Sequence, residues 1–325
     1  MDLPRLVVLI VLAPLTTAAA EPLSLDVVNK AEWSSSAAQG KGPDPVVIKA
    51  QILLDRARFA PGVVDGRAGE NFEHALAAFE RHHQLDGDGK IDETSWAKLK
   101  EISGEPVLKE YTIADEDVKG PFVENIPAKF ERRAKLARLG YTSPAELLAE
   151  KFHMNVSLLK ALNRGRNLDE AGTSIVVAAI ATEPPKAKVK TIEVHKREKA
   201  VRAFDKDGGL VAFYPASIGS EESPAPSGTH KVRTVVHNPV YRYDPARVQL
   251  KGVSKKRKLK IAPGPNNPVG SVWIGLSKDT YGIHGTPDPD KIGKTASNGC
   301  VRLTNWDAET LAGMIDKGTV VKFVD

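Results

Sequence analysis

The sequence of 325 residues contains only one cysteine, Cys300, so no disulfide can form within the chain. Aromatic residues make up only 6% of it, and its one long apolar run, from Leu6 to Leu15, is shorter than the roughly 20 residues that cross a bilayer. These absences exclude a small disulfide-stapled scaffold and an integral membrane protein. A chain of this length predicts about two or three soluble domains, each large enough for its own apolar core.

The first 20 residues have the three parts of a secretory signal peptide, namely one arginine, the apolar run and the small residues Ala18-Ala19-Ala20. We therefore expect the range 1–20 to be removed and the mature protein to work in the periplasm without a lipid anchor. The net charge of +5 suits an anionic partner such as the cell wall. Because the chain is predicted to be exported, we do not expect nucleic acid as a partner.

Cys300 lies in the segment Ser297-Asn298-Gly299-Cys300-Val301-Arg302 and follows His284 by 16 residues. A thiol with the usual pKa of about 8.5 is mostly protonated at neutral pH, so a nucleophilic cysteine needs a neighbouring base, for which His284 is the candidate. Gly299 lets the backbone approach a ligand, the amides beside Cys300 suit a developing oxyanion, and Arg302 suits a carboxylate. A cysteine alone is more often a small buried hydrophobe, but this combination predicts acyl transfer.

Residues 46–102 predict a small three-helix domain, preceded by a linker over 21–45. Apolar residues recur with helical spacing in three segments, which are separated by turns rich in Gly and Asp. The residues of the motif are Gln51, Leu54, Phe59, Pro61, Gly62, Val64, Asp65, Gly66, Ala75, Phe79, Asp88, Gly89, Thr94, Trp96 and Leu99. In this pattern the segment resembles the peptidoglycan-binding domain that accompanies cell-wall enzymes.

Two features of this domain are superficially similar to metal sites, but neither has the full set of ligands. His74, His82 and His83 lack the further ligands of a tetrahedral zinc site. The run Asp86-Gly87-Asp88-Gly89 is similar to the start of a calcium loop, but its twelfth position is Ala97 where such a loop needs a bidentate glutamate. We expect neither a metal ion nor a cofactor.

A charged, irregular stretch over 103–134 predicts a second linker, and residues 135–182 predict a second small module. Ser143 and Ser157 are candidate caps of two helices, and the β-branched run at 175–177 predicts a strand. This order resembles the helix–helix–strand part of a LysM module, a βααβ glycan-binding unit, although the first strand has no clear counterpart. A structural spacer is the alternative interpretation.

Residues 189–325 predict a mainly β domain, because segments with alternating apolar and polar residues follow the boundary at Pro184-Pro185. Four motifs follow in order, namely Pro226-Ser227-Gly228-Thr229-His230, Pro263-Gly264-Pro265-Asn266-Asn267-Pro268-Val269-Gly270, Tyr281-Gly282-Ile283-His284-Gly285-Thr286 and Ser297-Asn298-Gly299-Cys300-Val301-Arg302-Leu303. In these motifs the domain resembles the L,D-transpeptidase catalytic domain of the YkuD family. The chain is therefore predicted to be a multidomain α+β protein with a small helical peptidoglycan-binding module, a LysM-like α/β module and a mainly β, YkuD-type catalytic domain.

The resemblance implies a peptidoglycan L,D-transpeptidase, a cysteine acyltransferase that acts on a tetrapeptide stem. Cys300 would attack the carbonyl of the third residue and release D-alanine, while His284 would serve as general base and acid, oriented by the carbonyl of Gly285. The amides of Gly299 and Cys300 would hold the oxyanion. The further residues expected at this site are Ser297, Asn298, Tyr281 and Arg302, the last as a carboxylate reader or as a brace of the loop.

Two segments leave alternatives open. The family commonly has a histidine where this chain has Asn298, and an amide cannot titrate, although it can still donate hydrogen bonds. The range 251–260 contains six lysine or arginine residues, which form either a solvated loop or a basic rim that attracts stem carboxylates. The members of this basic run are Lys251, Lys255, Lys256, Arg257, Lys258 and Lys260.

The acyl acceptor also remains open in the sequence. An amine of a second stem would give a 3→3 cross-link, a lysine of an outer-membrane lipoprotein would tether the envelope, and water would make the enzyme an L,D-carboxypeptidase. A catalytically weak scaffold that binds peptidoglycan is a competing interpretation, whereas a zinc hydrolase using His284 and Cys300 lacks a third ligand. For the cross-linking enzyme, the tethering enzyme, the carboxypeptidase and the scaffold alike, the expected partners are peptidoglycan stem peptides and glycan strands.

Overall fold

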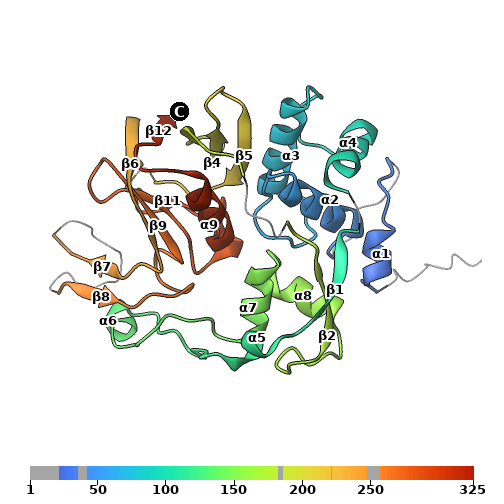
Figure 1. Ribbon diagram of the computed structural model, residues 1–325, viewed down its shortest axis with the longest axis horizontal. Coiled ribbons are helices and arrows are strands. Elements are labelled where there is room, and N and C mark those ends of the chain that lie inside the picture. Colours follow the sequence, from blue (N-terminus) through green and yellow to red (C-terminus); the bar gives the residue numbers. More distant parts are fainter. Residues whose placement is uncertain (1–21, 36–41, 105, 182–185, 221, 247–256) are drawn as a thin grey trace, which may run out of the picture.

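The structure is a computed structural model, and it describes residues 22–35, 42–104, 106–181, 186–220, 222–246 and 257–325. The expected signal peptide at 1–20 lies outside these residues. Figure 1 shows a large sheet-containing part on one side and two smaller, mainly helical parts on the other. No helix among the described residues is long and apolar enough to span a membrane.

The first module consists of three helices, as predicted. They are α2 (Pro45–Arg56), α3 (Glu70–His82) and α4 (Glu93–Ser103). Asp44 begins α2 by accepting hydrogen bonds from two amides of the first turn, with Pro45 directly after it. Asp92 and Ser95 form a reciprocal capping box at the start of α4. Ile48, Leu76 and the other apolar residues on the inner helix faces are fully buried.

The range 21–45, expected to be a linker, is partly folded onto this module. It contains α1 (Leu25–Asn29), whose Val28 is fully buried. Lys49 of α2 is also fully buried, and its Nζ donates to the main-chain carbonyls of Asn29 and Ala31 at 2.9 Å each. The expectation of a linker was therefore wrong for α1. The buried Lys49 of α2 binds the carbonyls at the C-terminal end of α1 and so fixes this helix to the module.

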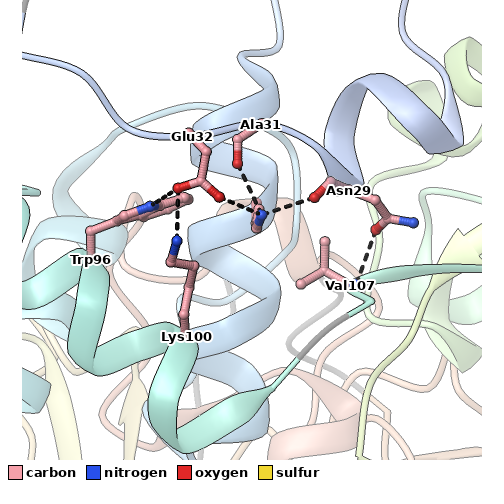
Figure 2. A network of polar contacts seen from close by, with 7 residues as sticks. Asn29, Ala31, Glu32, Trp96, Lys100 and Val107 are labelled. Atoms are coloured by element: carbon pink, nitrogen blue, oxygen red, sulfur yellow. Dashed lines mark hydrogen bonds and ion pairs between the residues drawn. The ribbon is translucent and has the colours of Figure 1, made fainter.

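A polar network fixes the chain that follows α1 (Figure 2). The carboxylate of Glu32 accepts hydrogen bonds from the Trp96 indole and from Lys100 Nζ, both at 2.8 Å, and lies 3.6 Å from Lys49 Nζ. The side chain of Asn29 accepts from the amide of Val107 at 3.0 Å. These contacts connect the N-terminal segment with the first module and with the start of the second.

The second module begins earlier than predicted. Its elements are β1 (Leu108–Thr112), α5 (Asp115–Lys119), α6 (Phe130–Arg133), α7 (Pro144–Lys151), α8 (Val156–Leu162) and β2 (Ser174–Ala178). β1 pairs antiparallel with β2, with Leu108 opposite Ala178. The linker expected over 103–134 is therefore corrected, because the unpatterned charged stretch contains the strand that completes a two-stranded sheet.

The third part is mainly β, as predicted, and is built on an eight-stranded sheet in the order β11-β10-β9-β6-β12-β3-β4-β5. Its strands are β3 (Thr191–His195), β4 (Ala200–Phe204), β5 (Leu210–Pro215), β6 (Gly228–His237), β9 (Val272–Leu276), β10 (Gly282–His284), β11 (Val301–Arg302) and β12 (Val320–Val324). A separate ribbon pairs β7 (Tyr241–Tyr243) with β8 (Leu259–Ile261). The 3-10 helix η1 (Pro289–Lys291) and the helix α9 (Asn305–Met314) complete it.

The three parts join through main-chain hydrogen bonds as well as side chains. The amide of Ala60 donates to the carbonyl of Phe213 on β5, and the amide of Val64 donates to the carbonyl of His153, both at 2.9 Å. The His153 ring also stacks on Trp306 of α9, with centroids 5.0 Å apart. One apolar core runs through both smaller modules and includes Ala200 of β4 and Phe213 of β5, whereas the other buried apolar residues of the sheet form a second core.

Candidate active site

Strand pairing brings together two residues that are separated in sequence. β10 ends at His284 and lies parallel to β11, so that His284 is opposite Arg302. The amide of Leu303 then donates to the carbonyl of His284 at 2.8 Å. Because Cys300 directly precedes β11, this register places the thiol and the imidazole at the same edge of the sheet.

A cavity of about 910 Å³ opens at this edge. Six of the predicted site residues line it, namely Cys300, His284, Arg302, Tyr281, Ser297 and Asn298. The other two, Gly285 and Gly299, are buried beside His284 and Cys300. The structure therefore brings these eight residues together around one cavity.

The imidazole of His284 is held in one orientation. Its Nδ1 donates to the Gly285 carbonyl at 2.7 Å, which leaves Nε2 as the nitrogen that can accept a proton. The ring stacks on Trp273 with centroids 5.5 Å apart. Burial lowers the pKa of His284 to about 4, and the positive charge of Arg302 adds to this effect against the opposing hydrogen bond to Gly285.

The surroundings of Cys300 favour the protonated form of its thiol. Burial raises its pKa, against the opposing effects of the Gly282 amide and the charge of Arg302. The S–H group donates to the main-chain carbonyl of Thr280 at 3.6 Å. Both shifts favour the uncharged forms of the two side chains, which we call the neutral pair.

The loop before Cys300 has a tight backbone that requires glycine. Gly299 has a φ of +98°, and a β-carbon there would lie 3.0 Å from a ring atom of Tyr281. The Ser297 hydroxyl donates to the carbonyl of Cys300, which closes the turn. Asn298 remains exposed at the rim of the cavity.

Sequence reasoning missed Asn305, which supports the loop that contains His284. Its Oδ1 accepts from the amides of Ser271 and Thr286 at 3.1 Å each, directly next to Gly285. Its Nδ2 donates to the buried carboxyl of Glu150 on α7 at 3.0 Å. Asn305 follows the Ser297–Leu303 motif closely, but no local pattern indicates its partners.

Sequence reasoning also missed Phe130 and Arg133 of α6, which line the same cavity although they belong to the second module. Figure 1 shows α6 next to the β7–β8 ribbon, far from α7 and α8. The segment Phe130-Glu131-Arg132-Arg133 combines an aromatic residue with two arginines, which is the only signal that the sequence offered.

The remaining candidate features lie elsewhere. His83 packs against the ring of Phe79, with centroids 4.5 Å apart. The described residues contain no group of three or more His, Cys, Asp or Glu side chains that could hold a metal ion. Of the basic run, Lys251, Lys255 and Lys256 lie outside the described residues, whereas Lys258 pairs with Asp244 of the cavity wall at 2.9 Å.

Comparison with known proteins identifies the family. Residues 189–323 match the model of the L,D-transpeptidase catalytic domain, and residues 43–99 match the model described as "Putative peptidoglycan binding domain". The "Putative L,D-transpeptidase YkuD" of Bacillus licheniformis is 30% identical over 178 residues, which are 54% of this chain and 90% of that protein. The chain belongs to the L,D-transpeptidase family. It is an enzyme with the function of a peptidoglycan L,D-transpeptidase, and it contains a peptidoglycan-binding domain.

Two further relatives of this L,D-transpeptidase are more distant. The "Probable L,D-transpeptidase YbiS" of Escherichia coli K12 is 27% identical over 190 residues, which are 57% of this chain and 61% of that protein. The crystal structure of L,D-transpeptidase 3 from Mycobacterium tuberculosis is 14% identical, with a TM-score of 0.35, and the match covers 48% of this chain and 76% of that one.

Proposed function

We propose that this L,D-transpeptidase transfers the acyl group of a peptidoglycan tetrapeptide through a thioester on Cys300. The thiolate sulfur forms a bond to the carbonyl carbon of the third residue while His284 Nε2 takes the thiol proton. The bond to D-alanine then breaks, and the imidazolium returns its proton to the leaving amine. An acceptor amine attacks the thioester, His284 removes its proton, and the Cys300 thiol is regenerated.

The neutral pair supports this order of events. The His284–Gly285 hydrogen bond leaves Nε2 available, as a base for the thiol requires. The carbonyl of Thr280 holds the thiol proton until a substrate displaces this contact. We assign the oxyanion to the amides of Gly299 and Cys300, each of which contributes about 3–4 kcal/mol in comparable sites.

We assign to Arg302 the role of carboxylate reader. Its guanidinium lines the cavity, and no hydrogen bond or ion pair engages it within the described part of the chain. If Arg302 instead stabilised the loop, its guanidinium would need a hydrogen-bond or ion-pair partner there. Tyr281, Asn298 and Ser297 complete the wall around the acyl group, and Asn298 does not deprive the site of a base because His284 is in place.

We infer that the accessory modules and the periplasmic location serve the same substrate. The helix pair α7–α8 directly before β2, with β1 paired to β2, supports a LysM-like second module, although α5 and α6 are two further helices between β1 and α7. A depression of about 410 Å³ beside α7 and α8 is its candidate glycan site. The sequence of residues 1–20 supports export to the periplasm by a signal peptide.

The test is mass spectrometry of the products that the mature protein forms from purified disaccharide-tetrapeptide, with Cys300→Ala as the control. Loss of D-alanine with dimer formation supports transfer to a stem amine. Addition of a lysine-containing lipoprotein peptide tests the tethering reaction in the same assay. Release of tripeptide alone would indicate an L,D-carboxypeptidase, and unchanged substrate would indicate a scaffold and overturn the proposal.

A further inference from the structure

Residues 120–141, which we call the strap, leave the second module, reach the β7–β8 ribbon of the catalytic domain and return (Figure 1). The two ends of the strap are joined, because the amide of Val123 donates to the carbonyl of Tyr141 at 2.8 Å. The return arm is fixed to the catalytic domain, since the amide of Leu139 donates to the carbonyl of Pro263 at 2.9 Å. The strap is therefore a fixed part of the wall.

The return arm is also anchored at Asn266 of the Pro263–Gly270 motif. The Asn266 amide donates to the carbonyl of Leu139 at 3.0 Å, and its side chain donates to the Gly140 carbonyl at 3.0 Å. The same side chain donates to Glu146 of α7 at 2.8 Å. A catalytic-domain motif thus holds both the strap and the helix that follows it.

At its tip the strap carries α6, which packs on the β7–β8 ribbon. The Phe130 ring meets Tyr241 and Tyr243 edge to face, with centroids 6.1 Å and 6.4 Å apart. Phe130 and Arg133 both line the cavity that contains Cys300. The second module therefore supplies one aromatic and one cationic side chain to the catalytic cavity.

Arg133 is oriented before any ligand binds. Its Nε donates to the carbonyl of Pro127 at 2.6 Å, and its guanidinium carbon lies 5.4 Å from the centre of the Phe130 ring. No hydrogen bond or ion pair in the described ranges uses its two terminal nitrogens. These two donors have the fork geometry that binds a carboxylate bidentately.

The three acidic residues that line the cavity, Glu222, Asp244 and Asp288, do not cancel this cation by direct contact. Asp288 pairs with Lys291 at 3.1 Å, Asp244 pairs with Lys258 at 2.9 Å, and no ion pair joins Glu222 to Arg133 in the part of the chain that the structure describes. Burial lowers the pKa of Arg133, and the charge of Asp288 opposes this shift. Arg302 adds a second cation to the cavity. A ligand with two separated carboxylates matches this distribution.

We propose that Arg133 of the strap is a specificity-determining residue that binds a carboxylate of the donor stem peptide away from the scissile bond. This inference rests on the proposed function, in which the donor is a tetrapeptide stem with free carboxylates. Arg302 of β11 reads the carboxylate nearer Cys300, and Arg133 reads the farther one. The second module thereby selects the substrate of the catalytic domain.

The experiment measures binding of disaccharide-tetrapeptide by calorimetry to the full chain carrying Cys300→Ala, alone and with Arg133→Ala. Arg132→Ala is the matched control, because Arg132 is the exposed neighbour on α6 and does not line the cavity. We expect Arg133→Ala to raise Kd by about 10- to 100-fold, as the loss of a charge-assisted bidentate contact does. We expect Arg132→Ala to leave Kd unchanged.

Two tetrapeptides, each with one stem carboxyl converted to the carboxamide, identify the contact. Amidation of the contacted carboxyl should weaken binding to the protein with Arg133 intact by the same factor, and should cost nothing more in Arg133→Ala. Equal Kd values for both arginine variants, or an amidation penalty that persists in Arg133→Ala, would overturn the proposal. If Arg133→Ala does not fold, the absence of any amidation penalty in the Cys300→Ala protein overturns it instead.

This binding experiment is independent of turnover. A protein that binds the free acid through Arg133 but releases no D-alanine would contradict the proposed function and leave the inference about Arg133 standing. Conversely, Cys300-dependent release of D-alanine with equal Kd values for both arginine variants would contradict only the inference.

Discussion

The catalytic cavity has two walls that are held in different ways. The wall with Cys300 and His284 belongs to one sheet, and parallel pairing of β10 with β11 fixes its geometry through the main chain. The wall with Phe130 and Arg133 belongs to the strap, and turn contacts and side-chain packing from another module fix its geometry. In our proposal the first wall provides the reacting groups and the second provides a ligand-binding surface.

If these proposed roles hold, a change in the sheet wall should alter the reacting groups, whereas a change in the strap wall should alter which substrate binds. The catalytic domain and the second module also meet outside the cavity at α9, where Asn305 binds the loop after His284 on one side and Glu150 of α7 on the other. Substitutions in each wall and at this junction should therefore affect kcat, KM and stability differently.

The largest effect is expected from breaking the sheet wall. Cys300→Ala should abolish transfer, and His284→Gln should lower kcat by about 10³- to 10⁵-fold, because the thiol then has no base. D-Alanine release under saturating substrate measures the loss. The exposed His237 provides the control, since His237→Gln should retain full activity. Activity above a tenth of wild type in His284→Gln would contradict the assigned base.

The next effect is expected at the junction. Asn305→Ala removes the acceptor of the Ser271 and Thr286 amides and the donor to Glu150, so the loop that orients His284 loses its support. We expect kcat to fall by about 100-fold and the free energy of unfolding to fall by about 2–4 kcal/mol. Steady-state kinetics and urea unfolding measure both. Thr310→Ala on the same helix is the control, and a change in KM alone would argue against a positioning role.

The pH dependence tests the neutral pair of the sheet wall. Because the pKa of His284 is about 4, the imidazole is a neutral base above that pH, so the acid limb of kcat/KM should lie near pH 4 rather than 6.5. Because burial raises the thiol pKa, alkylation of Cys300 by iodoacetamide should keep accelerating above pH 9. A plateau of the alkylation rate at neutral pH would show a thiolate–imidazolium pair instead.

A substitution remote from both walls should affect stability alone. Lys49→Ala leaves the carbonyls of Asn29 and Ala31 without their donor and opens a cavity, so we expect a loss of about 2–4 kcal/mol in the free energy of unfolding. Chemical unfolding measures the loss. Activity of the folded fraction should be unchanged, because the N-terminal segment does not line the catalytic cavity. Lys30→Ala, on the exposed side of the same segment, should change stability by less than about 0.5 kcal/mol.

The smallest effect concerns Glu150 at the junction. Burial raises its pKa to about 8, and the charges of Glu146 and Glu309 add to this effect, while the hydrogen bond from Asn305 opposes it. A carboxyl with a higher pKa in the folded protein binds more protons when folded, so the free energy of unfolding falls as pH rises from about 4.5 toward 8. Glu150→Gln should reduce this fall by about 1–2 kcal/mol, seen as a smaller decrease of Tm between pH 5 and pH 8. An identical decrease in both proteins would contradict a protonated Glu150.

The difference between the two walls also explains what could be predicted from the sequence. His284 and Cys300 each lie in a local motif, and only 16 residues separate them, so the thiol and its candidate base could be predicted from the sequence. The three-helix module and the mainly β domain follow from hydrophobic periodicity, and both were confirmed. The roles of the individual site residues and the LysM-like assignment stay predictions.

The features that could not be predicted from the sequence depend on contacts between residues far apart in the chain. Asn305 meets Glu150 across 155 positions of the chain, and α6 reaches the cavity from a stretch that looked like a linker. β1 is recognisable only through its pairing with β2, because five residues with mixed polarity carry no strand signal of their own. The burial of Lys49 could not be predicted either, because it depends on hydrogen bonds to carbonyls of a preceding segment.

The most direct test of the two-wall account is the acylation of Cys300, followed by intact-protein mass spectrometry at increasing concentrations of disaccharide-tetrapeptide. The account predicts the same maximal adduct on Cys300 in wild type, Arg132→Ala and Arg133→Ala, with a higher half-saturating concentration only in Arg133→Ala. No adduct on the wild-type thiol, or identical saturation curves for the three proteins, would contradict it.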